Sequence, residues 1–259
     1  METAAGKSIL GQLVLGRLQF FSRTIPQLTR QSQLASPAEE VRFQQAQQEA
    51  ILELADFYDQ AAGEVGEQTA SIFAIHAMLL EDDDFTQSVR NMICAQGVTA
   101  EYAVRSVSEQ LERAFSDMDS PYMRARAKDF LDISRRVIRL LLGMPTVDPL
   151  KKRTAILVVD EILPSELMEL DRHHLLGLIA RRGSVYSHAA QLLRAYNIPA
   201  MAEVGLGEHW EGHMALLDGY AQRLYLDPDQ ALIERLCRRY GKENRAAGNW
   251  NKKKEPQTV

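Results

Sequence analysis

The sequence predicts an α+β protein in which an antiparallel helical bundle is inserted into a mixed α/β unit. Three observations predict this class. Apolar residues recur with helical spacing between residues 36 and 143. Short apolar runs bounded by polar clusters follow at 155–159 and 175–180, as is typical of buried strands. The apolar segment 13–21 has strand composition but no partner among the helices, so we expect it to join the later sheet.

These patterns give the domain boundaries. We expect residues 1–22 and 145–229 to form the α/β unit and residues 33–143 to form the inserted helical unit. Residues 230–259 are expected to form a C-terminal helix followed by a polar, Lys-rich linker. The bundle would then interrupt the α/β unit between its first strand and the rest of its sheet.

Composition and charge exclude several classes of protein. The chain has 259 residues, of which 46% are hydrophobic, and a net charge of −5. This composition is typical of a globular protein, and the charge does not indicate a nucleic-acid partner. No run approaches the roughly 20 apolar residues that a membrane span needs, and no cleavable leader is recognisable. We therefore expect a cytoplasmic protein with no membrane partner.

Helix start and stop signals divide the inserted region. Ser36-Pro37-Ala38-Glu39 has the spacing of a capping box with proline in the first helical position. Gly97 is expected to end a helix, Thr99 to cap the next one, and Ser120-Pro121 to begin a last helix that runs to Gly143. These signals predict about four helices joined by short connections.

The second half is predicted to add further elements to the sheet. Residues 198–204 form a third candidate strand. Residues 214–217 and 224–226, joined through Asp218-Gly219, are expected to form a hairpin. Apolar residues recur with helical spacing over 230–240, so a helix is expected after the hairpin.

One histidine, His188, stands where the small-residue stretch 183–187 meets an amphipathic helical segment. At a helix N-terminus, free amides and the positive end of the macrodipole stabilise an anion, and the same field disfavours an imidazolium. A phosphorylated histidine fits both demands. A capping or hydrogen-bonded structural histidine fits these residues equally well, so both interpretations stay open.

The other histidines lack the spacing of a metal site. His209 and His213 are four residues apart, but Gly212 disfavours a helix there and no third ligand is evident. We expect a solvated loop at this point. The neighbouring pair His173-His174 precedes a strand and is expected to be an ordinary surface pair.

The acidic and sulfur-containing residues also give no site. The run Glu81–Asp84 lacks the spacing and the glycine of an EF-hand, so a solvated or partner-facing cluster is expected. Cys94 and Cys237 match no metal or redox spacing. The chain contains no GxxxxGK[ST] phosphate-binding loop. We therefore expect no metal site and no cofactor in this chain.

Five segments resemble one protein family. The stretch GSVYSHAAQLLRAYNIPA (183–200) is similar to the phosphohistidine signature of enzyme I, the phosphoenolpyruvate-protein phosphotransferase of bacterial sugar phosphotransferase systems. Four other segments look like the same family, in the same order: IFAIHAMLLEDDDF (72–85), SPYMRARAKDFLDISRRVIRLLLG (120–143), LPSEL (163–167) and LLDG (216–219). The resemblance covers nearly the whole chain. The chain is identified as a divergent member that resembles the N-terminal domain of enzyme I.

The resemblance implies a fold and an activity. In this family an α/β phosphohistidine (swivelling) subdomain carries an inserted four-helix subdomain that binds the carrier protein HPr. His188 falls on the phosphorylated position. It would take a phosphoryl group from phosphoenolpyruvate, bound with Mg²⁺ on a C-terminal barrel domain absent from this sequence, and pass it to a histidine of HPr in sugar uptake. Alone, the chain would only exchange phosphate with HPr.

The resemblance also implies roles for neighbouring residues. Support for the phosphate site falls on Gly183, Ser184, Ser187 and Arg194. Contacts with HPr fall on Glu67, His76, Met78, Leu79, Asp82, Asp84, Tyr122 and Arg126. Packing in a protein core would explain the apolar pair Met78 and Leu79 equally well.

The signature departs from the family at four positions. Ser184 replaces its second glycine, Val185 its usual arginine and Tyr186 a small residue, while Leu167 replaces a hydroxyl residue expected to hydrogen-bond the active histidine. These departures keep two alternatives open. One is a non-catalytic module that binds HPr or regulates it. The other is the phosphohistidine domain of a different phosphoenolpyruvate-utilising enzyme, such as a pyruvate phosphate dikinase or a dihydroxyacetone kinase subunit.

Overall fold

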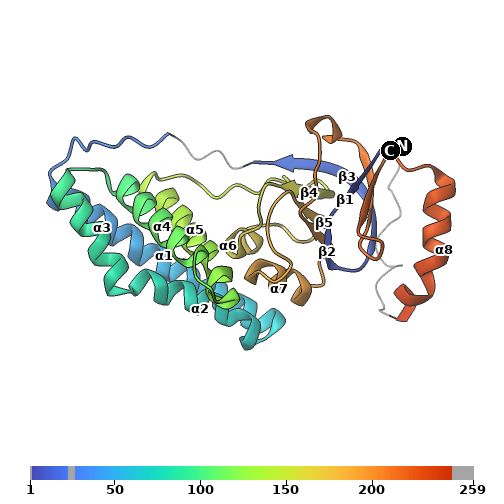
Figure 1. Ribbon diagram of the computed structural model, residues 1–259, viewed down its shortest axis with the longest axis horizontal. Helices are drawn as coiled ribbons and strands as arrows, with labels where there is room; N and C mark the ends of the chain where they lie inside the picture. Colours follow the sequence, from blue (N-terminus) through green and yellow to red (C-terminus); the bar gives the residue numbers. More distant parts are fainter. Residues whose placement is uncertain (1, 23–26, 247–259) are drawn as a thin grey trace.

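The computed structural model describes residues 2–22 and 27–246, with only the backbone given for residues 121, 122, 125 and 241–246. Figure 1 shows an elongated molecule with a helical region at one end and a sheet at the other. The eight strands are β1 (Thr3–Ala5), β2 (Lys7–Leu10), β3 (Leu13–Phe21), β4 (Ala155–Val159), β5 (Leu175–Ala180), β6 (Ala200–Ala202), β7 (Met214–Asp218) and β8 (Arg223–Leu226). The class is therefore α+β, as the sequence predicts.

The N-terminal strand β3 lies in the middle of the sheet, whose order is β1-β8-β7-β3-β4-β5-β6-β2. It pairs in parallel with β4 and antiparallel with β7, so it joins the strands that follow the helical region. The expected hairpin forms between β7 and β8. The expected strand over 198–204 is shorter and covers only β6.

Two short strands at the N-terminus, β1 and β2, were not predicted from the sequence. β1 pairs with β8 at one edge of the sheet, and β2 pairs with β6 at the other. Each strand has a single buried position, which is too little to show an alternating pattern. Gly6, between them, permits the close approach to β6, because a Cβ at this position would lie 2.4 Å from Val204 Cγ2 and 2.9 Å from the Ala202 carbonyl oxygen.

The chain leaves the sheet after β3 and returns to it at β4, and five helices lie between these strands (Figure 1). Their bounds are α1 (Ser36–Val65), α2 (Glu67–Glu81), α3 (Asp83–Gln96), α4 (Ala100–Ser116) and α5 (Pro121–Leu141). The expectation of about four helices was one too few. The extra helix is α3, which begins within the acidic run Glu81–Asp84. The Asp82 side chain caps it by accepting a hydrogen bond from the Phe85 amide.

The capping signals of the helical region are partly confirmed. Thr99 caps α4 by accepting from the Tyr102 amide, and Gly97 ends α3 in the left-handed conformation at φ 60°. The predicted capping box at Ser36 does not form, since the N-cap of α1 is Ala35. The carboxylate of Glu39 instead accepts from Ser32, Arg42 and the Ala100 amide, in the buried interior.

Three helices accompany the sheet: α6 (Pro164–Met168), α7 (His188–Ala195) and α8 (Gln230–Ala246). A short 3₁₀ turn covers Glu208–Trp210. The helix expected over 230–240 extends to residue 246, while the expected linker, 247–259, lies outside the described residues. No helix in the described ranges is both long and apolar enough to cross a membrane.

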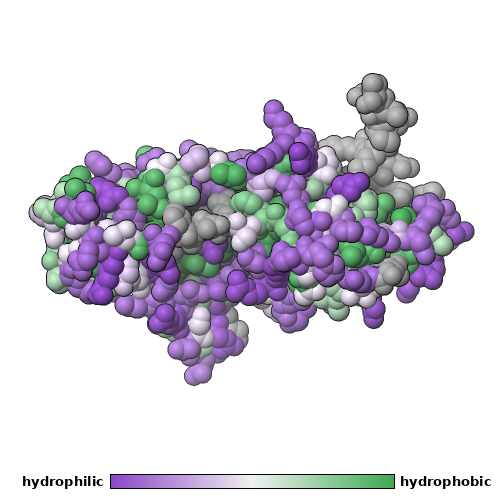
Figure 2. Space-filling view, turned by 90° about the horizontal axis from the view of Figure 1, so that it is seen from above, coloured by the Kyte–Doolittle hydropathy of each residue, from purple (hydrophilic) through white to green (hydrophobic). Residues whose placement is uncertain are grey.

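A continuous cluster of buried apolar side chains joins the helical region to the sheet region. It includes Phe73 of α2 and Ile133 of α5 together with Leu167 of α6 and Leu192 of α7. Figure 1 shows α6 and α7 between the long helices and the sheet. Figure 2 shows that hydrophilic residues cover most of one face of the molecule, with apolar residues scattered among them. The N-terminus of α7 therefore lies where the two regions pack together.

Candidate functional site

His188 is the first residue of α7, and the loop before it fixes its position. Ser187 is the N-cap, and its hydroxyl accepts a hydrogen bond from the Ala190 amide at 3.2 Å. Gly183 has φ of +122°, a conformation that other residues rarely adopt. Ser184 stabilises the turn by accepting from the Tyr186 amide at 3.1 Å. This loop places the imidazole at the helix N-terminus, as the sequence predicts.

A carboxylate from the helical region holds the His188 ring. Nδ1 of His188 lies 3.1 Å from Oδ1 of Asp129 on α5, and the two side chains are 15% and 3% exposed. Because a carboxylate can only accept, Nδ1 carries the ring proton in this contact. The lone pair of the neutral imidazole is then on Nε2. Leu167, which stands where the family has a hydroxyl residue, is buried and offers no hydrogen bond.

A second histidine lies behind this pair. His76 of α2 is fully buried, and its Nε2 is 3.2 Å from the same Asp129 oxygen. Its Nδ1 is 3.5 Å from Oδ2 of Asp132, which also accepts from the Ser165 amide at 2.9 Å. The structure therefore contradicts the expectation that His76 contacts HPr directly. The reason is helical periodicity: His76 shares the buried face of α2 with Phe73 and Leu80.

The contacts around Asp129 shift the pKa values of Asp129 and of His76. Burial alone would raise the pKa of Asp129, but its contacts with the His188 and His76 imidazoles outweigh this effect and lower the pKa to about 2. Burial would likewise lower the pKa of His76, yet the carboxylates of Asp129 and Asp132 raise it above the usual value. The cluster therefore favours an ionised Asp129 and a protonated His76.

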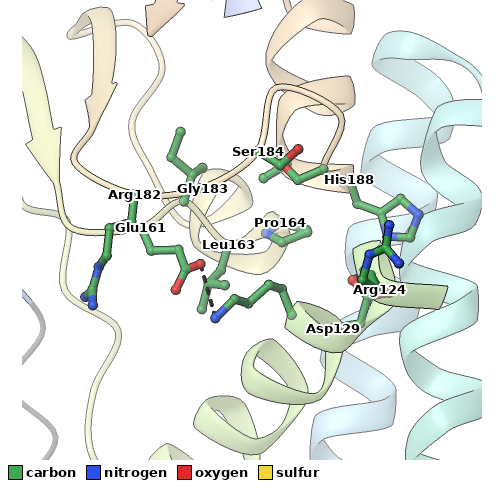
Figure 3. A pocket seen from close by; sticks show the side chains of 13 residues that line it. Arg124, Asp129, Glu161, Leu163, Pro164, Arg182, Gly183, Ser184 and His188 are labelled. Carbon is green, nitrogen blue, oxygen red and sulfur yellow. Dashed lines mark hydrogen bonds and ion pairs between the residues drawn. The ribbon is translucent and has the colours of Figure 1, made fainter. Parts of the chain in front are cut away.

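A pocket of about 370 Å³ opens beside His188. Figure 3 shows its walls, which come from α5, from the loop before α6 and from the loop before α7. Three basic side chains line it, Arg124, Lys128 and Arg182. The ammonium group of Lys128 forms ion pairs with the carboxylates of Glu112 at 2.7 Å and Glu161 at 3.4 Å. Guanidinium and ammonium groups beside a helix N-terminus are suited to a phosphoryl group.

Sequence reasoning missed both Asp129 and the basic residues. Asp129 is 59 positions from His188, so only the tertiary fold, in which α2 packs against both α5 and α7, brings them together. A usable signal was present: Asp129 and Asp132 are spaced i, i+3 on the face of α5 that also carries buried apolar residues. Arg182 directly precedes the Gly183 turn, and this adjacency also pointed to it.

The predicted phosphate-site residues divide into two groups. Gly183, Ser184 and Ser187 line the pocket with His188. Arg194 does not line it. Its guanidinium donates to the carbonyl oxygen of Ile9 at 3.1 Å and to that of Val185, because the side chain leaves the far end of α7 and reaches β2. Its observed contacts are structural: they tie the signature loop to the sheet.

The residues expected to contact HPr lie on α2, the start of α3 and α5. Glu67, Met78, Asp82 and Asp84 are exposed, while Leu79 and Arg126 are half-buried. Tyr122 is in α5, but its side chain lies outside the described residues. Met78 is 67% exposed, so core packing does not account for it, although Leu79 packs partly against the core.

Three of the remaining histidines contact separate carboxylates. His209 contacts Glu2 at 2.9 Å and His213 contacts Asp227 at 2.7 Å, so these two do not converge on one point. His174 pairs locally with Asp171 at 2.8 Å. Within the described residues, a group of atoms close enough to hold a metal ion occurs at His76, Asp129 and His188, whose ligand atoms lie within 4.8 Å of one another.

Two family models match the chain. The model for the N-terminal part of phosphoenolpyruvate-utilising enzymes covers residues 4–126. The model for the mobile domain of the same enzymes covers residues 151–222 and includes His188. The first match covers the N-terminal strands and most of the helical region, and the second covers most of the later strands of the sheet.

Curated relatives carry the name phosphoenolpyruvate-protein phosphotransferase. The Bacillus subtilis protein is 30% identical over 202 residues, which are 77% of this chain and 35% of that protein. The Lactococcus lactis subsp. lactis protein is 32% identical over 198 residues, which are 73% of this chain and 34% of that protein. The chain thus spans about a third of the length of these relatives.

Two solved structures resemble the fold. A solution structure titled Enzyme I (nEIt) superposes with a TM-score of 0.69 at 24% identity, covering 93% of this chain and 99% of that one. A structure titled N-terminal domain of Enzyme 1 - Nitrogen gives a TM-score of 0.60 at 25% identity, covering 92% and 99%. With both parts matched by models of one enzyme class, the chain belongs to the phosphoenolpyruvate-utilising enzyme family and is similar over most of its length to the N-terminal domain of enzyme I.

Proposed function

We propose that this chain is the phosphotransfer domain of an enzyme I-type phosphotransferase, that His188 accepts the phosphoryl group, and that an HPr-like carrier receives it in sugar uptake. The observation that carries this proposal is the contact between His188 Nδ1 and Asp129 at the N-terminus of α7. This contact supports Nε2 as the nucleophile, because it commits the proton to the other ring nitrogen.

The proposed step is an in-line displacement. The Nε2 lone pair of His188 forms a bond to phosphorus while the bond between phosphorus and the enol oxygen of phosphoenolpyruvate breaks, and the enolate leaves with that electron pair. The ring gains positive charge, which the buried carboxylate of Asp129 stabilises. The transfer to HPr is the same displacement, in which a carrier imidazole attacks and His188 leaves.

The pocket supports the phosphoryl group in this scheme. Arg124, Lys128 and Arg182 offer positive charge to its oxygens, and the first amides of α7 offer hydrogen bonds. Phosphoenolpyruvate with Mg²⁺ is expected to bind on a C-terminal domain, which this chain needs as a partner for the first transfer. Phosphorylated HPr can load His188 without that domain.

The proposed docking surface for HPr is the exposed side of α2 and the start of α3. It combines the exposed side chain of Met78 and the half-buried Leu79 with the carboxylates of Glu67, Asp82 and Asp84. Such a surface suits a partner with an apolar contact area surrounded by basic residues. Tyr122 and Arg126 on α5 are proposed to extend it.

The test is to incubate the chain with phosphorylated HPr and to locate the added phosphate by peptide mapping. We expect one phosphate per chain on His188, labile in acid and stable in base, and none in His188→Ala. His174→Gln is the matched control, because His174 pairs with Asp171 and lies outside the cluster around His188. If HPr binds but His188 acquires no phosphate, the chain is instead a non-catalytic HPr-binding module.

A further inference from the structure

We propose that His76, Asp129 and His188 form a binding site for a divalent transition-metal ion of the zinc class, and that an ion bound there prevents phosphorylation of His188. The second part rests on the function proposed above, whereas the site itself rests on geometry alone. The ligand atoms would be Nε2 of His76, a carboxylate oxygen of Asp129 and Nδ1 of His188.

The spacing of these atoms fits a tetrahedral site. The two imidazole nitrogens lie 3.2 Å and 3.1 Å from the same Asp129 oxygen. Zinc bonds to nitrogen and oxygen are about 2.0–2.1 Å long, so neighbouring ligand atoms in a tetrahedron are about 3.3 Å apart. The Asp129 oxygen therefore has about the separation from each nitrogen that a tetrahedral site requires, and all three ligand atoms lie within 4.8 Å of one another. Binding of the ion would release the protons from Nε2 of His76 and Nδ1 of His188 to solvent.

Two features of the cluster point to a ligand rather than to a closed hydrogen-bond network. His76 is fully buried, and neither of its ring nitrogens makes a hydrogen bond with good geometry within the described residues. Oδ2 of Asp129 is also buried and has no hydrogen-bond partner in the described part of the chain. The His76 nitrogens thus face carboxylates at 3.2 Å and 3.5 Å without forming hydrogen bonds of good geometry to them. Buried polar atoms without hydrogen bonds are uncommon and call for an explanation, and a metal ion supplies one.

The surroundings supply the outer contacts of a metal site. Asp132 lies 3.5 Å from Nδ1 of His76 and is itself held by the Ser165 amide. A carboxylate on the far nitrogen of a metal-binding histidine orients the ring and makes it a better ligand. Asp129 and His188 both line the pocket, so an ion can reach two of the three ligands from that side.

The type of ligand selects the metal. Two imidazoles and one carboxylate suit Zn²⁺ or Co²⁺, and a site with three protein ligands and one open position is common for zinc. Mg²⁺ and Ca²⁺ prefer oxygen ligands and are disfavoured here. The proposed site is thus distinct in chemistry from the Mg²⁺ that is expected to accompany phosphoenolpyruvate.

A bound ion would block the proposed reaction by changing the tautomer of His188. With the metal on Nδ1, the ring proton is on Nε2, and Nε2 then has no lone pair to attack phosphorus. The ion would also occupy the Asp129 carboxylate, which otherwise stabilises positive charge on the ring. Zinc should therefore compete with phosphorylation, and a chelator should reverse the inhibition.

The binding experiment titrates the full chain with Zn²⁺ by calorimetry and with Co²⁺ by visible absorption. We expect one ion per chain and the intense visible bands of four-coordinate Co²⁺. His76→Gln and His188→Gln should each weaken binding at least tenfold, and Asp132→Asn should weaken it ten- to a hundredfold. His174→Gln and Cys94→Ser are the controls, since both residues lie outside the cluster, and they should leave the affinity unchanged.

Each outcome bears on one part of the proposal. Absence of binding, or unchanged affinity in both folded His76→Gln and His188→Gln, would overturn the site, and circular dichroism would verify folding. His188→Gln keeps the test valid if His76→Gln does not fold, because His188 is not in the core. In a parallel assay, Zn²⁺ should abolish labelling of His188 by phosphorylated HPr. Labelling that persists at saturating Zn²⁺ refutes the inhibition, while absence of labelling without Zn²⁺ contradicts only the proposed function.

Discussion

Replacing Asp129 by asparagine removes the negative charge beside His188 while keeping the size of the side chain. Burial raises the pKa of this carboxylate, but its contacts with two imidazoles outweigh burial and lower the pKa from 3.8 to about 2. A shift of this size corresponds to about 2 kcal/mol of interaction. This interaction is the total over both imidazoles, so its share at the reacting ring limits the electrostatic loss to a factor of roughly thirty.

The amide adds a second effect. Its NH₂ group can donate to Nδ1 of His188, and this contact would leave the ring proton on Nε2 and remove the nucleophilic lone pair. We therefore expect Asp129→Asn to reduce the rate of phosphoryl transfer from phosphorylated HPr by ten- to a hundredfold. The amount of phosphorylated chain at equilibrium should fall as well, because the product ring carries positive charge.

Quenched-flow measurement with ³²P-labelled HPr would give both quantities. Asp132→Asn is the matched control, since Asp132 contacts His76 but no contact joins it to His188, and it should change the rate less than threefold. The reasoning is refuted if Asp129→Asn transfers phosphate within twofold of the unmodified chain, or if the two variants are equally slow. Thermal unfolding of each variant would separate a chemical effect from loss of the fold.

Three further predictions follow from the same contacts. Arg182→Gln removes a cation from the pocket and should slow transfer about tenfold without shifting the midpoint of urea unfolding by more than the error of the measurement. Met78→Asp should raise the Kd for HPr about tenfold in calorimetry, because the exposed side chain would lose an apolar contact, while the far-ultraviolet circular dichroism stays the same. The pKa of Asp129 is depressed from 3.8 to about 2 in the folded chain, so its stabilisation is fully present above pH 3.8 and is lost as the pH falls towards 2. The free energy of unfolding should drop by about 2 kcal/mol more in the unmodified chain than in Asp129→Asn over this interval.

Local signals predicted much of the site loop. The small residues before His188 and the hydroxyl of Ser187 define a helix start by themselves, and the structure has that start at the expected residue. The pairing of β3 with the later strands also followed from the sequence, because an apolar strand with no partner among helices must pair elsewhere. Its central place in the sheet was not predicted. Both inferences depend on interactions within a few residues or on a simple requirement for pairing.

Tertiary packing decided the features that the sequence did not reveal. Asp129 reaches His188 only because α2 packs against both α5 and α7, and nothing in the spacing of the two residues shows this. The same packing buries His76, whose exposure depends on which face of α2 meets α5. Glu39 has capping-box spacing, yet Arg42 and the Ala100 amide recruit it instead. In each case a distant partner outweighs a local pattern.

The central claim is that Asp129 directs phosphorylation to Nε2 of His188. The direct measurement is a long-range ¹H–¹⁵N correlation spectrum of the ¹⁵N-histidine-labelled chain, recorded before and after loading with phosphorylated HPr. We predict that the neutral His188 ring is protonated at Nδ1 before loading, and that the phosphorus is bonded to Nε2 afterwards. A ring protonated at Nε2 beforehand, or phosphate found on Nδ1 or on a different histidine, would contradict the account.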